Sequence, residues 1–544
     1  MTKVTISNTH HASRDSMTLT FTTPGLSVFS EPASDSPFVP TAMPDIANSP
    51  LEYMISLGGN LDDTASATSL LDQIATSTHV EVEKEQPNEP GTEPYSAQSP
   101  DPDAVTKEVQ KQYEKLPYPF RNPEDDKKFL LLTMLDNLAT INQVCYQGKR
   151  DFSKPFRILV AGGGTGDAST FLAIQTATMP NVHIQYLDLS TESMRIAKER
   201  LHNQSVRLGF PDVEKNVDFR IGSLLDVEKM GIGKFDLINC SGVLHHLPDP
   251  CAGLAALRSV LKDDGAMSLM IYGQIGRTSI YQVQDLMRLI TCNTDDVDEK
   301  LAQTNLMLRN LPSCNIHRKN GRWMANEGNP VEIHDLFLHC QDRAYTVDQM
   351  YDWVEAAGLH LCGFSAGLQT FMDKEAIGTQ LPPRIRAIME KMSARELARF
   401  TELHFGHFNK YEFYVSASPP EKAGIDMDDW EIIPEFSVFA KIQKLQEAIQ
   451  QTTAAEVRFK IDTHCGQTYY TLNNDFVQRV LCSHINGTNN MEQLTEIMKQ
   501  FVPGAPPERV RELTLKRLEK LIFGNMILFR HPEGNVSNLN RYNF

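Results

Sequence analysis

Short apolar runs and helical stretches alternate regularly between Phe156 and Tyr272. The runs are rich in β-branched residues and cover Arg157–Ala161, His183–Leu187, Val217–Ile221, Phe235–Asn239 and Met267–Tyr272. Strands that alternate with helices in this way form parallel βαβ units, because each helix carries the chain back across the sheet. The sequence therefore predicts an α/β fold built on a doubly wound sheet.

The chain continues beyond the fifth predicted strand with an insertion, Gly273–Arg343, of mixed character. An insertion at this point reaches the carboxyl edge of the sheet, where ligands bind, so we expect it to form a lid and an acceptor pocket. A helix at Val347–Ala357, a strand at Leu359–Phe364 and a final strand at Tyr411–Ser416 then return to the sheet. We expect one folded domain over residues 105–416.

The two ends of the chain differ from this domain. Residues 1–104 are rich in Ser, Thr, Pro and acidic residues without sustained periodicity, so we expect a disordered acidic tail. Residues 430–544 show helical patterns and end in a strand-like run; these segments are Val438–Ile449, Thr471–Asn489, Met491–Phe501, Pro507–Leu521 and Met526–Phe529. They predict a small α+β accessory module that is similar to a winged helix.

Charge and cysteine content argue against several classes of protein. The 544 residues carry a net charge of −17, and the 15 acidic and 3 basic residues of segment 1–104 leave only −5 for the rest. Residues 105–544 therefore have no strong basic field, which argues against a nucleic-acid partner. The nine cysteines are scattered and include no C-x-x-C pair, which argues against disulfides and against a zinc site. No run approaches about 18 apolar residues and no secretory signal is evident, so we expect a soluble, cytoplasmic protein that does not bind membranes.

A glycine-rich loop, Ala161–Asp167, follows the first predicted strand directly and opens a helix. Glycines let the backbone turn sharply and approach a ligand, and the helix N-terminus supplies free N–H groups. Asp188 ends the second predicted strand 22 residues beyond Gly166, where a carboxylate reaches the ribose hydroxyls of an adenosine. A dehydrogenase and a methyltransferase would both use this pair.

The glycine spacing and the fourth strand separate these two classes. The loop has the spacing G-x-G-x-G, not the G-x-G-x-x-G of dinucleotide sites. The chain resembles the class I S-adenosylmethionine-dependent methyltransferase family at the loop, at Tyr186–Ser190 and at Val243–Leu247, over about residues 105–416. This resemblance implies a Rossmann-like, seven-stranded sheet with an antiparallel last strand. It also implies S-adenosyl-L-methionine as the cofactor and S-adenosyl-L-homocysteine as its product.

The same resemblance assigns roles to residues at the strand ends. It places Gly162, Gly164 and Gly166 around the methionine part of the cofactor, Asp188 and Leu189 at the ribose and adenine, and Asn239, Cys240 and Ser241 beside the sulfonium. After the third strand the chain has Ser223 and Leu224 where the family often has an acid for the adenine amine, so Ser223 would replace that acid only in part.

A strap, residues 116–123, holds three prolines and is expected to be extended. With the preceding Tyr113 it looks like segments that cover the cofactor in related enzymes. Tyr113 is therefore a candidate cofactor-binding residue, and Tyr118 and Arg121 are further candidates, with simple packing an equal explanation for the two tyrosines.

Methyl transfer from a sulfonium requires in-line placement of the acceptor and exclusion of water, and it needs a base only if the acceptor must lose a proton. His245 and His246 are candidate bases and Tyr272 is a third catalytic candidate. The insertion is dense in titratable groups, and its candidate acceptor-binding residues are Arg277, His334, His339, Asp342 and Arg343. Arg343 suits a carboxylate clamp. The absence of an H-x-x-x-H pair argues against a metal.

The sequence thus predicts an S-adenosylmethionine-dependent methyltransferase for a small-molecule acceptor, with a carboxylate-bearing molecule as one candidate. Two alternatives stay open. One is a protein or tRNA methyltransferase whose C-terminal module, residues 430–544, recruits the macromolecule. The other is a non-catalytic scaffold that only binds the cofactor.

Overall fold

The computed structural model describes residues 5–9, 16–22, 102–319, 328–369, 371–372, 374–378, 381–437, 455–463, 466–523 and 526–534. The chain divides into two compact units, of which one joins Met1–Ser27 to Asp101–Phe544 and the other is Val28–Pro100. No described residue belongs to the second unit. Most of the predicted acidic tail and the helix predicted at Val438–Ile449 therefore lie outside the described residues.

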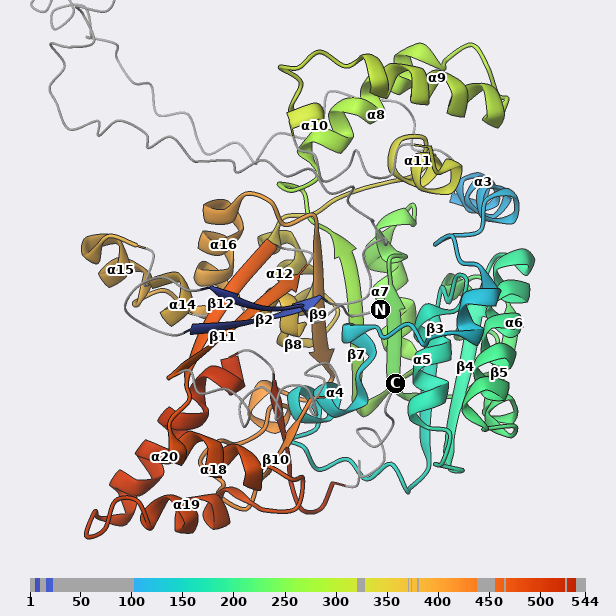
Figure 1. Cartoon of the computed structure of the whole chain (residues 1–544). Coiled ribbons are helices and arrows are strands. Elements are labelled where there is room, and N and C mark those ends of the chain that lie inside the picture. Colours follow the sequence, from blue (N-terminus) through green and yellow to red (C-terminus); the bar gives the residue numbers. More distant parts are fainter. Residues whose placement is uncertain are drawn as a thin grey trace, which may run out of the picture. The chain divides into compact units, whose positions relative to one another are not determined.

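A seven-stranded sheet is the core of the first unit (Figure 1). Its strands are β3 (Phe156–Ala161), β4 (Val182–Asp188), β5 (Val217–Ile221), β6 (Phe235–Ser241), β7 (Leu261–Tyr272), β8 (His360–Phe364) and β9 (Lys410–Ser416). They lie in the order β5-β4-β3-β6-β7-β9-β8. Strands β3 to β7 pair in parallel, and β9 pairs antiparallel with both β7 and β8. The predicted doubly wound sheet with an antiparallel last strand is confirmed.

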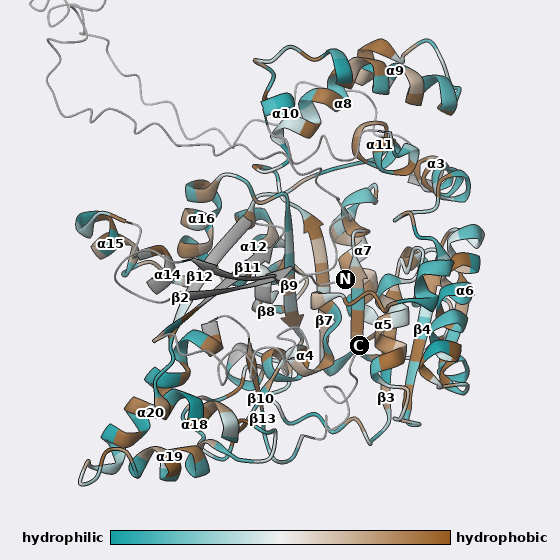
Figure 2. Cartoon of the chain, viewed as in Figure 1, coloured by the Kyte–Doolittle hydropathy of each residue, from teal (hydrophilic) through white to brown (hydrophobic). Residues whose placement is uncertain are grey.

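Both faces of the sheet are covered, which explains why the predicted strands read as continuous apolar runs. Successive residues of β3 enter opposite cores, Ile158 and Val160 on one face and Leu159 and Ala161 on the other. The helices α5 (Asp167–Gln175) and α6 (Thr191–Leu208) contribute to the first core; α7 (Pro250–Ser259), α12 (Val347–Ala356) and α16 (Ala394–Phe405) contribute to the second. Figure 2 shows α6 largely hydrophilic and β7 largely hydrophobic, as expected for a covering helix and a buried strand.

The described residues of the insertion after β7 form four helices with a small apolar core of their own. They are α8 (Thr278–Ile290), α9 (Val297–Asn310), α10 (Ile316–Lys319) and α11 (Pro330–Phe337). Asn329 begins α11, because its side chain accepts hydrogen bonds from the first N–H groups of the helix. The helix α3 (Pro102–Lys115), which precedes the strap, lies beside α11 (Figure 1).

The described ends of the chain differ from the sequence predictions at two places. Strands β1 (Thr5–Thr9) and β2 (Ser16–Thr22) form inside the expected disordered tail, and β2 pairs with β11 (Glu456–Thr463). The prediction missed the strict alternation of polar and apolar residues in β2. The predicted helix at Thr471–Asn489 is also wrong at its start, because β12 (Gly466–Asn473) runs to Asn473 and Asp475 caps the helix that follows.

That helix is α18 (Phe476–His484), and α19 (Met491–Lys499) and α20 (Pro507–Phe523) come after it. Strand β13 (Ile527–Arg530) ends the described chain and pairs with β10 (Ile433–Phe436), which precedes all three helices. The winged-helix comparison for residues 430–544 stays a prediction. In the part of the chain that the structure describes, no helix combines the length and the apolar character needed to cross a bilayer.

Candidate functional site

The glycine loop makes a turn that only glycine fits. Gly162 and Gly164 have φ values of +75° and +50°, a region that side chains disfavour. A Cβ atom on Gly162 would lie 2.3 Å from Val243, and one on Gly164 would lie 2.7 Å from the backbone oxygen of Tyr118. Gly166 then caps α5 without a side-chain acceptor. The N-terminus of α5 thus favours an anionic group, as the sequence predicted.

Asp188, at the end of β4, is tied to this loop. Its Oδ2 accepts a hydrogen bond from the Gly164 N–H at 2.7 Å, and its Oδ1 accepts one from the Ser190 N–H at 2.9 Å. Burial raises the pKa of Asp188, and the N–H groups of Ser190, Gly164 and Leu189 act against this rise. The carboxylate is held in place by the backbone at the carboxyl edge of β4, and it retains lone pairs for a ligand.

The strap lies directly against the glycine loop. The Thr165 N–H donates to the carbonyl oxygen of Tyr118 at 3.3 Å, and the Thr165 hydroxyl donates to that of Pro119 at 2.7 Å. Arg121 extends this contact, because its Nη2 lies 2.6 Å from Oδ2 of Asp167, the first residue of α5. The strap is therefore fixed to both the loop and the helix that follows it.

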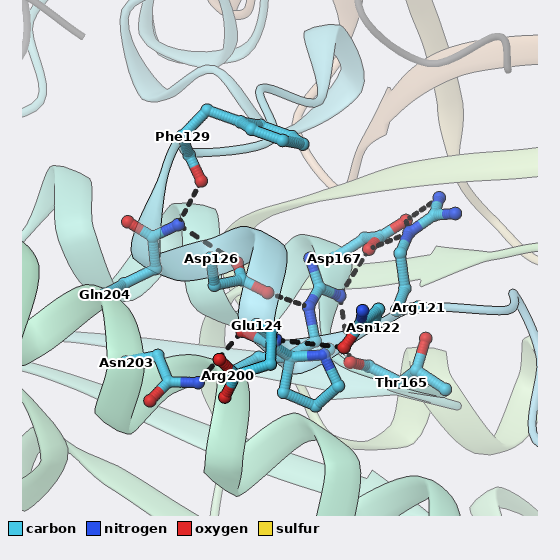
Figure 3. Close-up of polar contacts among 12 residues, drawn as sticks. Arg121, Asn122, Glu124, Asp126, Phe129, Thr165, Asp167, Arg200, Asn203 and Gln204 are labelled. Carbon is cyan, nitrogen blue, oxygen red and sulfur yellow. Dashed lines mark hydrogen bonds and ion pairs between the residues drawn. The ribbon is translucent and has the colours of Figure 1, made fainter. Parts of the chain in front are cut away.

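A network of four charges continues from Arg121 into the interior, where Arg200 and Asp126 are buried (Figure 3). Arg200 of α6 donates to Asp167 through Nη1 at 2.6 Å and to Asp126 through Nε at 2.7 Å. Gln204, one turn further along α6, donates to the other oxygen of Asp126 at 3.0 Å. Burial alone would raise the pKa of Asp167, but Arg121 and Arg200 outweigh it and hold that pKa well below its ordinary value. The network joins the strap, α5 and α6.

The candidates after β5 take part in local packing. The Ser223 hydroxyl oxygen accepts a hydrogen bond from the Leu225 N–H at 3.2 Å and so begins a short 3-10 helix. Leu224 is buried in the core beneath α7. An adenine role for either residue stays a prediction.

Two of the three candidate residues for the sulfonium side, all at the end of β6, are buried. Asn239 is 1% exposed and donates through Nδ2 to Asp136 and to Ser268. Cys240 is fully buried, and burial raises the pKa of its thiol to about 12. Both side chains point into the packed interior, so any contact with a sulfonium would come from their backbone. Ser241, by contrast, is partly exposed.

A second polar cluster lies where β6 and β7 end and α3 and α11 meet. The Tyr113 hydroxyl of α3 lies 3.3 Å from Oδ1 of Asp335 and 3.1 Å from Nε2 of His339. The Tyr272 hydroxyl, at the end of β7, lies 3.3 Å from the other oxygen of Asp335. One ligand atom each of His246, Asp335 and His339 lies within 4.8 Å of the others. We call these five residues the acceptor cluster.

Hydrogen bonds define the tautomers of the two histidines in this cluster. His246 Nδ1 lies 2.8 Å from the carbonyl oxygen of Gln341, so this nitrogen carries the proton and Nε2 keeps its lone pair. His339 is the opposite case, because its Nδ1 accepts the Gln341 N–H at 3.0 Å and the proton is left on Nε2. The rings of His246 and His339 stack at 3.9 Å. Burial lowers the pKa of both, so both are neutral near pH 7.

His245 and Tyr272 stack at 3.7 Å, and the guanidinium of Arg277 lies 3.5 Å from the centre of the Tyr272 ring. Neither ring nitrogen of His245 has a hydrogen-bond partner among the residues that the structure describes, although this side chain is fully buried. Arg277 pairs through Nη2 with Asp342 at 2.9 Å, and both side chains are buried.

Of the five predicted acceptor residues, only His339 belongs to the acceptor cluster. Arg343 is exposed, and the partner of Asp342 is Arg277. The predicted carboxylate clamp would therefore depend on an exposed arginine, because Arg343 is not buried. His334 is buried on α11 without a partner for Nδ1, and burial, with Lys300 and Lys115 nearby, lowers its pKa to about 4.

Comparisons with known proteins agree with this geometry. Residues 159–267 match the family model described as "Methyltransferase domain". An uncharacterized protein of Synechococcus sp. is 30% identical over 321 residues, which cover 58% of this chain and 73% of that protein. A ubiquinone biosynthesis O-methyltransferase of Xanthomonas axonopodis is 34% identical over 113 residues, which cover 21% of this chain and 41% of that protein.

Solved structures show the same fold. PKMT2 from Rickettsia typhi has a TM-score of 0.52 at 13% identity and covers 74% of this chain and 76% of its own. Its complex with AdoHcy has a TM-score of 0.50 at 14% identity, with 73% and 76% covered. The chain belongs to the class I S-adenosylmethionine-dependent methyltransferase family. Its cofactor is S-adenosylmethionine.

The sequence analysis missed two parts of this methyltransferase. Sequence reasoning did not single out Asp335, which lies in the last turn of α11, two residues before the helix ends and four before His339. The Arg200 network was missed altogether, because Arg200 lies in an otherwise hydrophilic helix and resembles a solvated residue. The signal that could have found the network is the position of Arg200 itself, because it lies on the buried face of α6.

Replacing Asp188 with asparagine is expected to weaken S-adenosylmethionine binding about 10- to 100-fold. A charged hydrogen bond contributes about 1.5–3 kcal/mol, and the neutral amide would also present a donor to the Gly164 N–H. Calorimetric titration would measure this loss. Asp218→Asn, on the exposed face of the neighbouring β5, is the control. Equal affinity in both variants would remove Asp188 from the cofactor site.

Proposed function

We propose that this methyltransferase transfers the methyl group of S-adenosylmethionine to a small-molecule acceptor, with His246 removing the acceptor's proton. The observation that carries the proposal is the free lone pair on His246 Nε2. Since Nδ1 donates to a backbone carbonyl, Nε2 is held as an acceptor at the carboxyl end of β6. This edge of the sheet is also where the glycine loop and Asp188 lie.

The cofactor-binding roles follow from the loop geometry. The backbone around Gly162, Gly164 and Gly166 and the N-terminus of α5 suit the methionine part, and the carboxylate of Asp188 suits the ribose hydroxyls. Tyr113 belongs to the acceptor cluster by its contacts, and the strap that follows it covers the loop. Methyl transfer then depends on orientation and on exclusion of water.

A small acceptor fits this cluster better than a large one. His246, Asp335 and His339 are 5%, 2% and 4% exposed, so the reacting end of the acceptor must be narrow. The relative from Xanthomonas, an O-methyltransferase of ubiquinone biosynthesis, carries a name consistent with small-molecule chemistry. A macromolecular acceptor recruited by residues 430–544 is the second possibility.

A transfer assay with methyl-labelled S-adenosylmethionine would separate the two possibilities. A cell extract is divided by ultrafiltration, and each fraction is incubated with the full-length enzyme. We expect label in the small molecules of the filtrate. Label confined to proteins or RNA of the retentate would contradict the proposal and favour the macromolecular acceptor. Label in neither fraction, with normal cofactor binding, would favour the non-catalytic scaffold.

A further inference from the structure

The positive charges beside the acceptor cluster are already neutralised. Arg277 pairs with Asp342 at 2.9 Å, and Arg121 pairs with Asp167 at 2.6 Å. Both of these arginines are therefore paired already, and neither is left unpaired for an anionic acceptor. Helix α11 carries two carboxyl groups, those of Glu332 and Asp335. Neither is hydrogen-bonded to a cation among the described residues.

Asp335 is positioned to receive a positive charge. Its two oxygens each face one phenol, from Tyr113 and from Tyr272, and a carboxylate has further lone pairs. The ring of Tyr272 is fixed between His245 and Arg277, which directs its hydroxyl toward Asp335. Burial and the nearby Asp342 raise the pKa of Asp335 to about 7, so a bound cation would restore its ionised form.

The histidines supply an independent indication of a ligand. His245 is fully buried, and in the described part of the chain neither of its ring nitrogens has a hydrogen-bond partner. A buried polar group without a partner is costly, and a ligand that brings a hydrogen-bond donor would satisfy the nitrogen of the neutral His245 ring that carries the lone pair. His246 Nε2 and the Asp335 carboxylate also accept hydrogen bonds. The three residues together favour a ligand that is rich in donors and positively charged.

We propose that the acceptor of this methyltransferase is an amine, held as an ammonium ion by Asp335 and deprotonated by His246. The proposal deepens the function proposed above and rests on it. An ammonium group offers three donors and no acceptor, which matches the Asp335 carboxylate and the lone pair on His246 Nε2.

The reaction balances with the groups present. The ammonium gives one proton to His246 Nε2, and the nitrogen lone pair then forms a bond to the methyl carbon of the sulfonium. The bond between that carbon and sulfur breaks, and its electron pair stays on sulfur as the neutral thioether of S-adenosylhomocysteine. The product is a methylated ammonium, and the proton on His246 passes to solvent.

A divalent metal is the other cation that this set of ligands could hold, because His246, Asp335 and His339 offer three ligand atoms close together. The hydrogen bond from the Gln341 N–H to His339 Nδ1 argues against it. That bond places the proton of His339 on Nε2, the nitrogen that faces the cluster, whereas a metal needs a lone pair there.

The test compares three panels of acceptors with matched carbon skeletons: primary amines, alcohols and carboxylic acids. Methyl-labelled S-adenosylmethionine reports transfer, and alkaline treatment releases labelled methanol only from methyl esters. We expect label in the amines. Transfer to alcohols or carboxylic acids would overturn the amine assignment while leaving the proposed methyltransferase activity on small molecules intact.

Binding gives a second measurement that does not depend on turnover. Butylammonium, butyrate and butanol are titrated into the enzyme loaded with S-adenosylhomocysteine, and butylammonium is expected to bind most tightly. Asp335→Asn is expected to weaken butylammonium binding about 10- to 100-fold with cofactor binding unchanged. Asp285→Asn, exposed on α8, is the control. Tighter binding of butyrate, no binding of butylammonium, or a stoichiometric metal in the purified enzyme would overturn the proposal.

Discussion

Replacing His246 with asparagine is expected to lower kcat for methyl transfer by about 10²- to 10⁴-fold, the usual contribution of a general base. Asparagine retains an N–H group near the position of Nδ1 and can still donate to the Gln341 carbonyl, but it has no lone pair at the position of Nε2. Because burial lowers the pKa of His246, the wild-type imidazole is already the free base at neutral pH.

The measurement is single-turnover transfer of labelled methyl at saturating cofactor. S-adenosylhomocysteine affinity serves as the check on folding, and His202→Asn serves as the matched control. His202 is exposed on α6 and contacts only Glu214 among the described residues. A His246→Asn enzyme that keeps normal kcat would show that the acceptor loses its proton elsewhere, with Asp335 as the next group to test.

Replacing Arg200 with methionine is expected to destabilise the fold by about 3–5 kcal/mol, the usual cost of breaking a buried ion pair. Asp167 would keep Arg121, but Asp126, with a side chain 5% exposed, would keep only its amide partner Gln204. Burial would lower the pKa of Arg200, and the two carboxylates overcome that effect, so the arginine is charged in the fold.

The control for this variant is Arg195→Met, five residues earlier on the same helix. Arg195 is exposed and pairs with Glu192 and Glu199, so its loss is expected to cost about 1 kcal/mol or less. Urea denaturation would compare the two. Replacing Asp126 with leucine in the Arg200→Met protein should recover part of the loss, because no unpaired buried charge then remains there. Equal stability of the two single variants would mean that the network is solvated.

The sheet could be predicted because its information is local. Apolar runs of strand length, separated by helical stretches, fix the elements and their parallel pairing, and the glycine loop with Asp188 marks the edge where a ligand binds. The antiparallel last strand came from the family resemblance. Strand β2 was not predicted, although the alternation of its polar and apolar residues is also local. The acidic and proline-rich composition of the surrounding segment favoured a disordered tail instead.

The acceptor cluster could not be derived in the same way. Its partners come from α3, from the ends of β6 and β7, and from α11, so Tyr113 meets Asp335 across 222 positions of sequence. Ion pairing was equally non-local: the partner of Asp342 is Arg277, 65 residues away, and not the adjacent Arg343. The sequence identified most of these residues as candidates, but it could not show which of them are in contact.

The strap that covers the glycine loop is continuous with the helix that carries Tyr113. The carbonyl groups of the strap accept hydrogen bonds from Thr165 of the loop. Tyr113, a few residues upstream of the strap, is hydrogen-bonded to Asp335. A displacement of the strap that opens a path to the loop would also draw Tyr113 away from Asp335. Exchange of spent for fresh cofactor would then loosen the contact between Tyr113 and Asp335 in the same movement, so that release of the cofactor and release of the acceptor would be coupled.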